Sequence, residues 1–286
     1  MTATAFSTPH STEWHRDIAD QNTILLSEVG STMHGVTVAA DDIDEMGVCI
    51  PPPEVALGVR ASTLHVFEQY EFRTQPVGVR SGPGDIDRTI YSLRKFARLA
   101  GQGNPTVLMI LYSPPEMLRA IEQPGHMLRG RRDLFISRQA GYRFEGYLKR
   151  QRERITGELS QRTNRPELVE RYGFDTKFAY HALRLAMQGI ELMQEGYITL
   201  PMPANARGYL VDVRTGKYGK DEVLDHLDSL TADLQRATEK SEWLERAARS
   251  GSVIARDRIS AREAEVVQKI AKERARPGNA EAMFST

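Results

Sequence analysis

Two short motifs, a Gly-Ser pair and an Asp-x-Asp, most constrain what this chain can fold into. Gly30-Ser31 follows a stretch over residues 23–29 whose apolar residues predict a buried strand. Asp42-Ile43-Asp44 begins eleven residues after Ser31 and enters a second predicted strand that ends before a run of three prolines. Side chains alternate between the two faces of a strand, so Asp42 and Asp44 point the same way. Two carboxylates held this close repel each other unless cations neutralise them.

The chemistry of these residues predicts a site for a metal-bound triphosphate. Carboxylate oxygens are hard ligands that suit Mg²⁺ or Mn²⁺. A pair of such ions, about 3.5–4 Å apart, stabilises both the attacking and the leaving oxygen of a displacement at phosphorus. Gly30 lets the backbone approach a phosphate, and Ser31 offers a hydroxyl and a backbone N–H at the start of a helix. Each motif alone is commonly a plain turn or a solvated strand end, and their conjunction favours chemistry.

Composition excludes several other classes of protein. The chain has 286 residues, with 38 basic and 38 acidic side chains, so its net charge excludes a protein that coats nucleic acid by charge alone. A single cysteine, Cys49, excludes a disulfide framework and a multi-cysteine zinc site. The longest apolar run, residues 107–112, is too short to cross a bilayer, and no signal peptide is apparent. We therefore expect a cytoplasmic protein without a membrane partner.

The pattern of elements predicts an α+β fold, in which a small mixed-sheet unit precedes a helical unit. Strands are predicted over 23–29, 43–50 and 67–72, and helices over 90–100, 174–196 and 221–250. After Thr106 the pattern is almost entirely helical. We expect a flexible N-terminal segment at 1–20, the sheet domain at 21–115, the helical domain at 116–250 and a charged helical or frayed tail at 251–286.

The motifs resemble the signature of the DNA polymerase β-like nucleotidyltransferase superfamily. That signature combines Gly30-Ser31, the second glycine at Gly35 and the Asp-x-Asp at Asp42-Ile43-Asp44. One departure is Asp41, where the superfamily more often has serine. We expect little effect, because that residue mainly orients the turn, although an extra acid could alter metal affinity. The resemblance implies a small nucleotidyltransferase domain, with Mg²⁺ or Mn²⁺ as cofactor and an NTP, such as ATP, as substrate.

A narrower resemblance, over about residues 22–202, is to the RNA-repair-associated branch of this superfamily, predicted nucleotidyltransferases often found beside RNA ligases. The motifs that carry it are Met46-Gly47-Val48, Tyr91 to Phe96, Gly103-Asn104-Pro105, Asp175-Thr176-Lys177, His181, Arg184-Leu185 and Leu200-Pro201. The branch implies an RNA end as the acceptor, with tRNA among the candidates.

The resemblance also implies roles for further residues. The superfamily uses a third carboxylate, for which Asp87 is the first candidate and Asp85 the second; it would ligate metal and help to deprotonate the attacking hydroxyl. Asp87 could instead cap the helix predicted after it. His34 and Lys177 occupy positions where the family pattern places basic residues, so we predict that they contact the nucleotide, together with Gly30 and Ser31. A solvated lysine is nearly as common an outcome.

The predicted activity is transfer of a nucleoside monophosphate from an NTP to an acceptor hydroxyl, with release of pyrophosphate. Asp42, Asp44 and Asp87 would be catalytic and would hold the metal. Three alternatives stay open: modification of a protein by a toxin- or antitoxin-like enzyme, a nucleotide-binding regulator without turnover, and an interaction protein that uses the helix at 221–250.

The strongest charge asymmetry lies in the helical part. Residues 119–154 carry ten bases against four acids, with aromatic residues interleaved, whereas residues 1–54 carry nine acids and one base. The basic segment could hold a nucleic-acid backbone, and its aromatics could stack on bases. A charge run is more often a solvated face, and aromatics at this spacing are more often part of the core. The aromatics concerned are Phe135, Tyr142, Phe144 and Tyr147.

Overall fold

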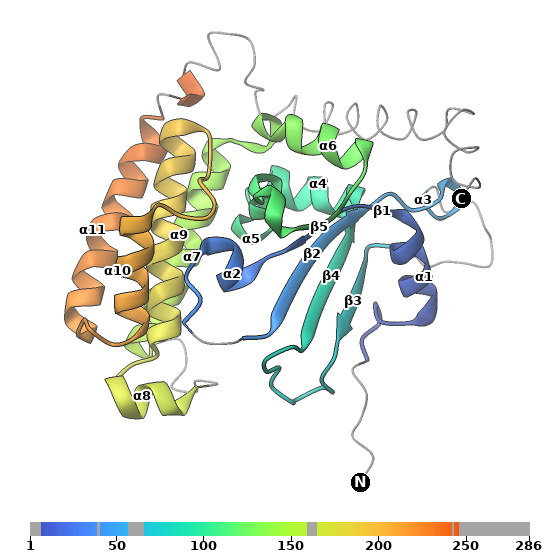
Figure 1. The fold of residues 1–286 in the computed structure, drawn as a ribbon. Coiled ribbons are helices and arrows are strands. Elements are labelled where there is room, and N and C mark those ends of the chain that lie inside the picture. The colour runs from blue at the N-terminus through green and yellow to red at the C-terminus, as the bar shows by residue number, and fades with distance from the viewer. Residues whose placement is uncertain (1–6, 39–40, 57–65, 159–164, 242, 246–286) are drawn as a thin grey trace.

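The computed structural model describes residues 7–38, 41–56, 66–158, 165–241 and 243–245. Its centre is a five-stranded mixed sheet in the order β3-β4-β2-β1-β5. Helices α7, α9, α10 and α11 stand together beside the sheet (Figure 1). The strands are β1 (Thr23–Glu28), β2 (Ile43–Cys49), β3 (Gln69–Arg73), β4 (Ile86–Ser92) and β5 (Leu118–Ile121).

Strand pairing brings the two sequence motifs together. β1 and β2 are antiparallel, with Glu28 opposite Glu45, so the residues after β1 lie next to those before β2. β2 and β4 are parallel, and their register places Asp44 beside Asp87. Paired residues on neighbouring strands share a face of the sheet. The sheet therefore gathers the glycine turn, the Asp-x-Asp and the third carboxylate at one end.

The helices fall into two groups: α1 to α6 are interspersed with the strands along the chain and lie close to the sheet, whereas α7 to α11 follow the last strand and form a separate helical group beside it. Near the sheet are α1 (Glu13–Asn22), α2 (Gly30–His34), α3 (Pro53–Ala56), α4 (Leu93–Gly101), α5 (Pro105–Leu108) and α6 (Gln123–Gly130). Beside it are α7 (Arg138–Thr156), α8 (Pro166–Tyr172), α9 (Thr176–Glu195), α10 (Ala204–Arg214) and α11 (Lys220–Glu239). Short 3₁₀ turns are η1 (Met109–Tyr112), η2 (Pro115–Met117) and η3 (Arg132–Phe135).

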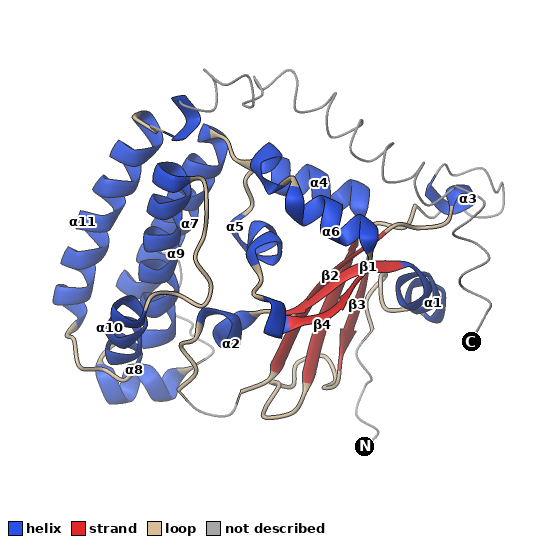
Figure 2. Cartoon of the chain, turned by 45° about the horizontal axis from the view of Figure 1, so that its top comes forward, coloured by secondary structure: helices blue, strands red, loops and turns tan. Residues whose placement is uncertain are grey.

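One continuous core joins the sheet to the helices beside it. Buried side chains from β1, α4, α7, α9 and α11 belong to a single cluster, among them Leu25, Phe96, Phe144, Tyr180 and Leu234. A second, smaller cluster lies between α1 and the opposite face of the sheet. Figure 2 shows α4 and α6 together over the strands and α1 apart from them. Because the large core is shared, the side chains of α7 and α9 are held at fixed positions relative to β2 and β4.

Several predicted elements are confirmed. The strands predicted over 23–29, 43–50 and 67–72 are β1, β2 and β3, and the helix predicted over 174–196 is α9. The Asp175 side chain accepts hydrogen bonds from the backbone N–H groups of Lys177 and Phe178 and so caps α9. The fold class, α+β with a mixed sheet and many helices, is also as predicted.

Other predictions are wrong in part. The helix predicted from Ile90 begins only at Leu93, because residues 90–92 complete β4 and Ser92 caps the helix. The chain after Thr106 is almost entirely helical, as predicted, and the exception that the pattern did not predict is β5, an edge strand beside β1. The division of the chain at residue 20 stays a prediction; most of α1 lies before that boundary and buries Ile18 and Ala19.

The predicted helix over 221–250 corresponds to α11 and ends at Glu239. Residues 242 and 246–250 of that prediction and the predicted tail at 251–286 lie outside the described residues. Within the described ranges, no helix combines the length and the apolar character needed to span a membrane.

Candidate active site

Three carboxylates converge at the N-terminal ends of β2 and β4, which are neighbouring parallel strands. One oxygen from each of Asp42, Asp44 and Asp87 lies within 4.8 Å of the other two, and all three residues are half-buried. Asp42 immediately precedes β2, and the β2–β4 register pairs Asp44 with Asp87. The structure thus brings together all three of the predicted catalytic residues.

Electrostatics make this cluster costly without a cation. Burial, followed by the charges of Asp42 and Asp87, raises the pKa of Asp44 to about 6 from its ordinary value of 3.8. Burial and the neighbouring Asp41 also raise the pKa of Asp42. A set of close, hard oxygen donors that resist ionisation fits a divalent ion such as Mg²⁺ or Mn²⁺. The residues present therefore fit the metal that the sequence predicts.

Gly30 has no space for a side chain, because it packs against Asp44. Its φ of +72° is in the left-handed region, and a Cβ added there would lie 2.5 Å from Asp44 Oδ2. The backbone N–H of Val29 also donates to the Asp44 carbonyl at 2.8 Å. The glycine thus lets the start of α2 pack directly against a carboxylate of the cluster, with Ser31 following it in the first turn.

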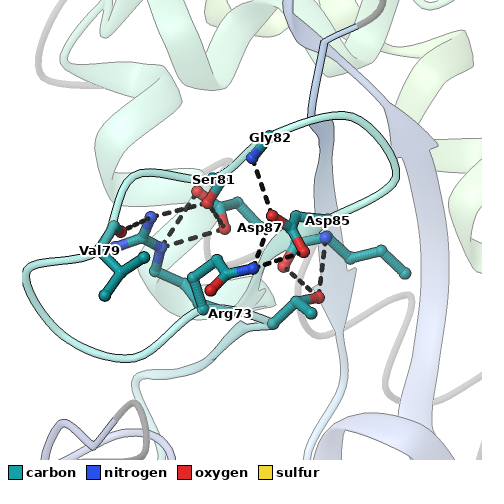
Figure 3. Close-up of polar contacts among 9 residues, drawn as sticks. Arg73, Val79, Ser81, Gly82, Asp85 and Asp87 are labelled. Atoms are coloured by element: carbon teal, nitrogen blue, oxygen red, sulfur yellow. Dashed lines mark hydrogen bonds and ion pairs between the residues drawn. The ribbon is translucent and has the colours of Figure 1, made fainter. Parts of the chain in front are cut away.

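Asp87 is held in place by two side chains from the β3–β4 hairpin (Figure 3). Arg73 Nε lies 3.1 and 3.2 Å from its two carboxylate oxygens, and the Ser81 hydroxyl donates to one of them at 3.0 Å. Asp85 has a different role. It accepts hydrogen bonds from the Gln75 amide and the Gly82 backbone N–H, and so closes the hairpin loop. Of the two candidates for the third carboxylate, Asp87 is the one that joins the cluster.

Asp41 links the cluster to the helices. Its Oδ2 lies 3.8 Å from Lys177 Nζ and 3.4 Å from Arg214 Nη2, and its Oδ1 accepts from the Asp42 backbone N–H at 3.2 Å. Although burial acts to raise it, the pKa of the Asp41 carboxyl is lowered by Lys177, the hydrogen bonds with Asp42 and Arg214. The acid that departs from the superfamily pattern is therefore an ionised partner for two cations.

Lys177, predicted to contact the nucleotide, lies in the first turn of α9 and reaches toward the site. Burial lowers the pKa of its ammonium, and the charge of Asp41 opposes that effect. Because Asp41 is adjacent to Asp42, this ion pair places a positive charge beside the carboxylate cluster.

His34, also predicted to contact the nucleotide, is buried between α2 and α9. Its Nε2 lies 2.6 Å from Arg184 Nη1, and its Nδ1 lies 3.0 Å from the Gln188 side-chain amide. Burial and then the Arg184 charge lower the pKa of the imidazole well below 6.5, which favours its neutral form. These contacts tie His34 to α9, and a phosphate would have to compete with both partners for its ring nitrogens.

A cavity of about 640 Å³ separates the carboxylates from the helices. Asp44, Asp87 and Gly30 lie on its sheet side, and the opposite wall comes from α7, the segment before α8, and α9. That wall is basic: Arg154 and Arg165 both lie over the Phe178 ring, with guanidinium carbons 5.4 and 5.2 Å from its centroid. The cavity therefore has an acidic wall suited to cations facing a basic wall suited to phosphates.

Sequence reasoning missed Arg73, Ser81 and Arg214 as neighbours of the acids. Arg73 comes directly after the predicted strand at 67–72, and Ser81 lies in a loop rich in Gly and Pro. Only the antiparallel β3–β4 register, which pairs Arg73 with Asp87, shows that they meet. Arg214 lies at the end of α10 and contacts Asp41 across 173 positions of sequence.

Comparison with known proteins defines the class as a polymerase β-type nucleotidyltransferase family. The model of the RNA repair pathway DNA polymerase beta family matches residues 8–279, and the chain belongs to this family. This confirms the predicted superfamily and branch.

Individual relatives are distant. The chain is 28% identical over 103 residues to an uncharacterized 38.9 kDa protein from the nrdC-mobD intergenic region of Enterobacteria phage T4. That match covers 36% of this chain and 29% of the phage protein. A nucleotidyltransferase-like protein from Exiguobacterium sibiricum aligns over 79% of this chain and 72% of its own, with 11% identity and a TM-score of 0.28. A TM-score this low does not indicate a shared fold.

Proposed function

We propose that the chain transfers a nucleoside monophosphate from an NTP to a hydroxyl at an RNA end. The acceptor oxygen forms a bond to the α-phosphorus, the bond from that phosphorus to the oxygen bridging to the β-phosphate breaks, and pyrophosphate leaves. The proton of the acceptor hydroxyl passes to a carboxylate of the cluster, for which Asp87 is the candidate. The family, through its association with RNA repair, supports RNA as the acceptor.

The observation that carries the proposal is the pairing of a three-carboxylate cluster with a basic wall across one cavity. Asp42, Asp44 and Asp87 would hold the divalent ions, which supply stabilisation of the charge that develops on phosphoryl oxygens. Lys177 and the arginines of the basic wall would hold the triphosphate. Gly30 and Ser31 would let the start of α2 approach it. Positioning of this kind is the main contribution a protein makes to phosphoryl-type transfer.

A transfer assay with each radiolabelled NTP, in Mg²⁺ or Mn²⁺, tests the proposal. Total RNA and total protein are offered as acceptors, and wild type is run beside the Asp42→Asn/Asp44→Asn variant. A matched control, Asp17→Asn/Asp20→Asn, makes the same charge change on α1. We expect label on RNA from wild type and the control, and a loss of at least 100-fold in the cluster variant.

Two other outcomes would contradict the proposal in different ways. Label on protein that depends on Asp42 and Asp44 would keep the chemistry and replace the acceptor. NTP binding without transfer to either acceptor would leave a nucleotide-binding regulator.

A further inference from the structure

We propose that the exposed face of α7 holds the backbone of the acceptor RNA and leads its end into the cavity; this inference rests on the proposed function. The face is formed by Arg143, Lys149, Arg150 and Arg154, and is called here the basic face of α7. All four residues are exposed. At 100° per residue, Arg143, Arg150 and Arg154 lie within about 40° of one another, and Lys149 lies about 100° from Arg150 on the same exposed half of the helix. At about 1.5 Å per residue the four residues extend over about 16 Å.

The four cations of the basic face have no acidic partners among the described residues. Within the described ranges, no carboxylate lies within ion-pair distance of its four cations. Exposed arginines elsewhere do pair: Arg80 with Glu167, Arg94 with Glu68 and, on α7 itself, Arg152 with Asp228. A protein of zero net charge that leaves four cations unpaired on one helix face has concentrated positive potential there.

The acids of α7 do not cancel this charge. Glu145 turns toward α11, where its Oε1 accepts from Gln235 Nε2 at 2.6 Å. Glu153 lies within the stripe and is half-buried, so the face carries four cations against one acid. A phosphate backbone, with one negative charge per nucleotide, is the polyanion that such a linear array fits.

The basic face of α7 ends at the cavity that the carboxylates line. At its C-terminal end, Arg154 lines the cavity that also contains Asp44 and Asp87, as do Tyr147 and Gln151 of the same helix. An RNA strand that follows the face would therefore present its end to the carboxylate cluster. At the other end, Tyr142 is 52% exposed and is available to stack on a base. Phe135 and Phe144, in contrast, are core residues.

Binding of a fluorescein-labelled, unstructured 20-nucleotide RNA, followed by anisotropy over a range of salt concentrations, tests the inference. The test variant is Arg143→Gln/Lys149→Gln/Arg150→Gln, which spares Arg154 because that residue lines the cavity. The control is Arg16→Gln/Arg94→Gln/Lys217→Gln, which removes the same charge from α1, α4 and the loop between α10 and α11. Circular dichroism and thermal midpoints check that both variants fold.

We expect the α7 variant to bind RNA at least tenfold more weakly, and the control to bind within twofold of wild type. Each phosphate contact on a single strand contributes about 0.7 to the slope of log K against log salt concentration. Removal of three contacts should therefore make that slope shallower by about 2. An α7 variant with the affinity and slope of wild type would overturn the inference. The inference would also be overturned if the wild-type protein bound no RNA. The same holds if loss of the basic face reduced only the labelling of an acidic protein and left RNA binding unchanged.

Failure of this inference is distinguishable from failure of the proposed function. The Asp42→Asn/Asp44→Asn variant should lose transfer and keep RNA binding. Transfer to RNA that survives loss of the basic face would refute the inference alone. RNA binding that depends on the basic face, without any NMP transfer by wild type, would refute the proposed function alone.

Discussion

The Arg73 guanidinium faces both carboxylate oxygens of Asp87, with Nε 3.1 Å from one and 3.2 Å from the other. The two residues are opposite each other in the β3–β4 register, and both side chains are 27% exposed. Arg73 also donates to the Ser81 hydroxyl at 2.7 Å, and Ser81 donates to Asp87. One predicted metal ligand is thus fixed by a small network before any ion binds.

Replacement of Arg73 by glutamine should weaken the site and the fold together. We expect the metal-free protein to lose about 1–2 kcal/mol of unfolding free energy, since a charge-assisted contact to a half-buried carboxylate is removed. Mn²⁺ should bind about tenfold or more weakly, because partners that orient a ligating carboxylate contribute to metal affinity. Urea unfolding and calorimetric Mn²⁺ titration measure the two effects.

Arg80→Gln is the matched control for this experiment. Arg80 lies in the same hairpin, and its ion pair with Glu167 is exposed at both ends. Exposed pairs contribute little, so both measurements should stay near wild type. Tighter Mn²⁺ binding by the Arg73 variant would show instead that the guanidinium competes with metal for Asp87.

Asp44→Asn should stabilise the metal-free protein while abolishing its response to metal. The folded-state pKa of Asp44 is raised to about 6, so its ionised form destabilises the fold above that pH. Relative to the ordinary value of 3.8, the full penalty is at most about 3 kcal/mol, and we expect a gain of about 1–2 kcal/mol at pH 7.5. The gain should shrink as pH falls through 6 toward 4, where the wild-type carboxyl is protonated.

Urea unfolding in EDTA at pH 7.5 and pH 4.5 measures this effect, with the exposed Asp17→Asn as control. A variant that is less stable than wild type at pH 7.5 would contradict the electrostatic account of the cluster.

Gly30→Ala and Gly84→Ala separate backbone strain from crowding at the site. Both glycines have positive φ, but a Cβ at Gly84 meets nothing within 4 Å, whereas at Gly30 it meets Asp44 Oδ2 at 2.5 Å. We expect about 1 kcal/mol of destabilisation for Gly84→Ala and about 2–3 kcal/mol for Gly30→Ala. Only Gly30→Ala should reduce Mn²⁺ binding, since only there must a carboxylate move. If Gly30→Ala and Gly84→Ala changed Mn²⁺ affinity by the same factor, the contact of Gly30 with Asp44 would not matter for metal binding.

Local patterns were sufficient to predict the elements that carry the acids. The apolar runs at 23–29 and 43–50 predict β1 and β2, and the alternation of a strand predicts that Asp42 and Asp44 share a face. Asp175 and Thr176 are both residue types that cap helices, so the start of α9, and hence the position of Lys177, can be predicted to within a residue. Each of these depends on residues close together in sequence.

Features set by tertiary pairing could not be predicted in this way. β5 is a four-residue edge strand with Arg119 and Ala120 exposed, so it lacks the apolar alternation that identifies a strand. The choice between Asp85 and Asp87 depends on the β2–β4 register. The contacts of Arg73 and Arg214 with Asp87 and Asp41 depend on pairing between distant segments, and no local pattern encodes that pairing.

Lys177→Met should separate nucleotide binding from catalysis. Lys177 faces Asp41 beside the cluster, and the variant leaves Asp41 paired with Arg214, so the fold should tolerate it. If the ammonium contacts the triphosphate in both ground and transition states, KM for the NTP should rise about tenfold with kcat nearly unchanged. The control is Lys217→Met, which should leave both constants unchanged, because the Lys217 side chain is 65% exposed and its ammonium pairs with Asp212. A fall in kcat at constant KM would place Lys177 in transition-state stabilisation, and unchanged constants would leave it as the partner of Asp41 alone.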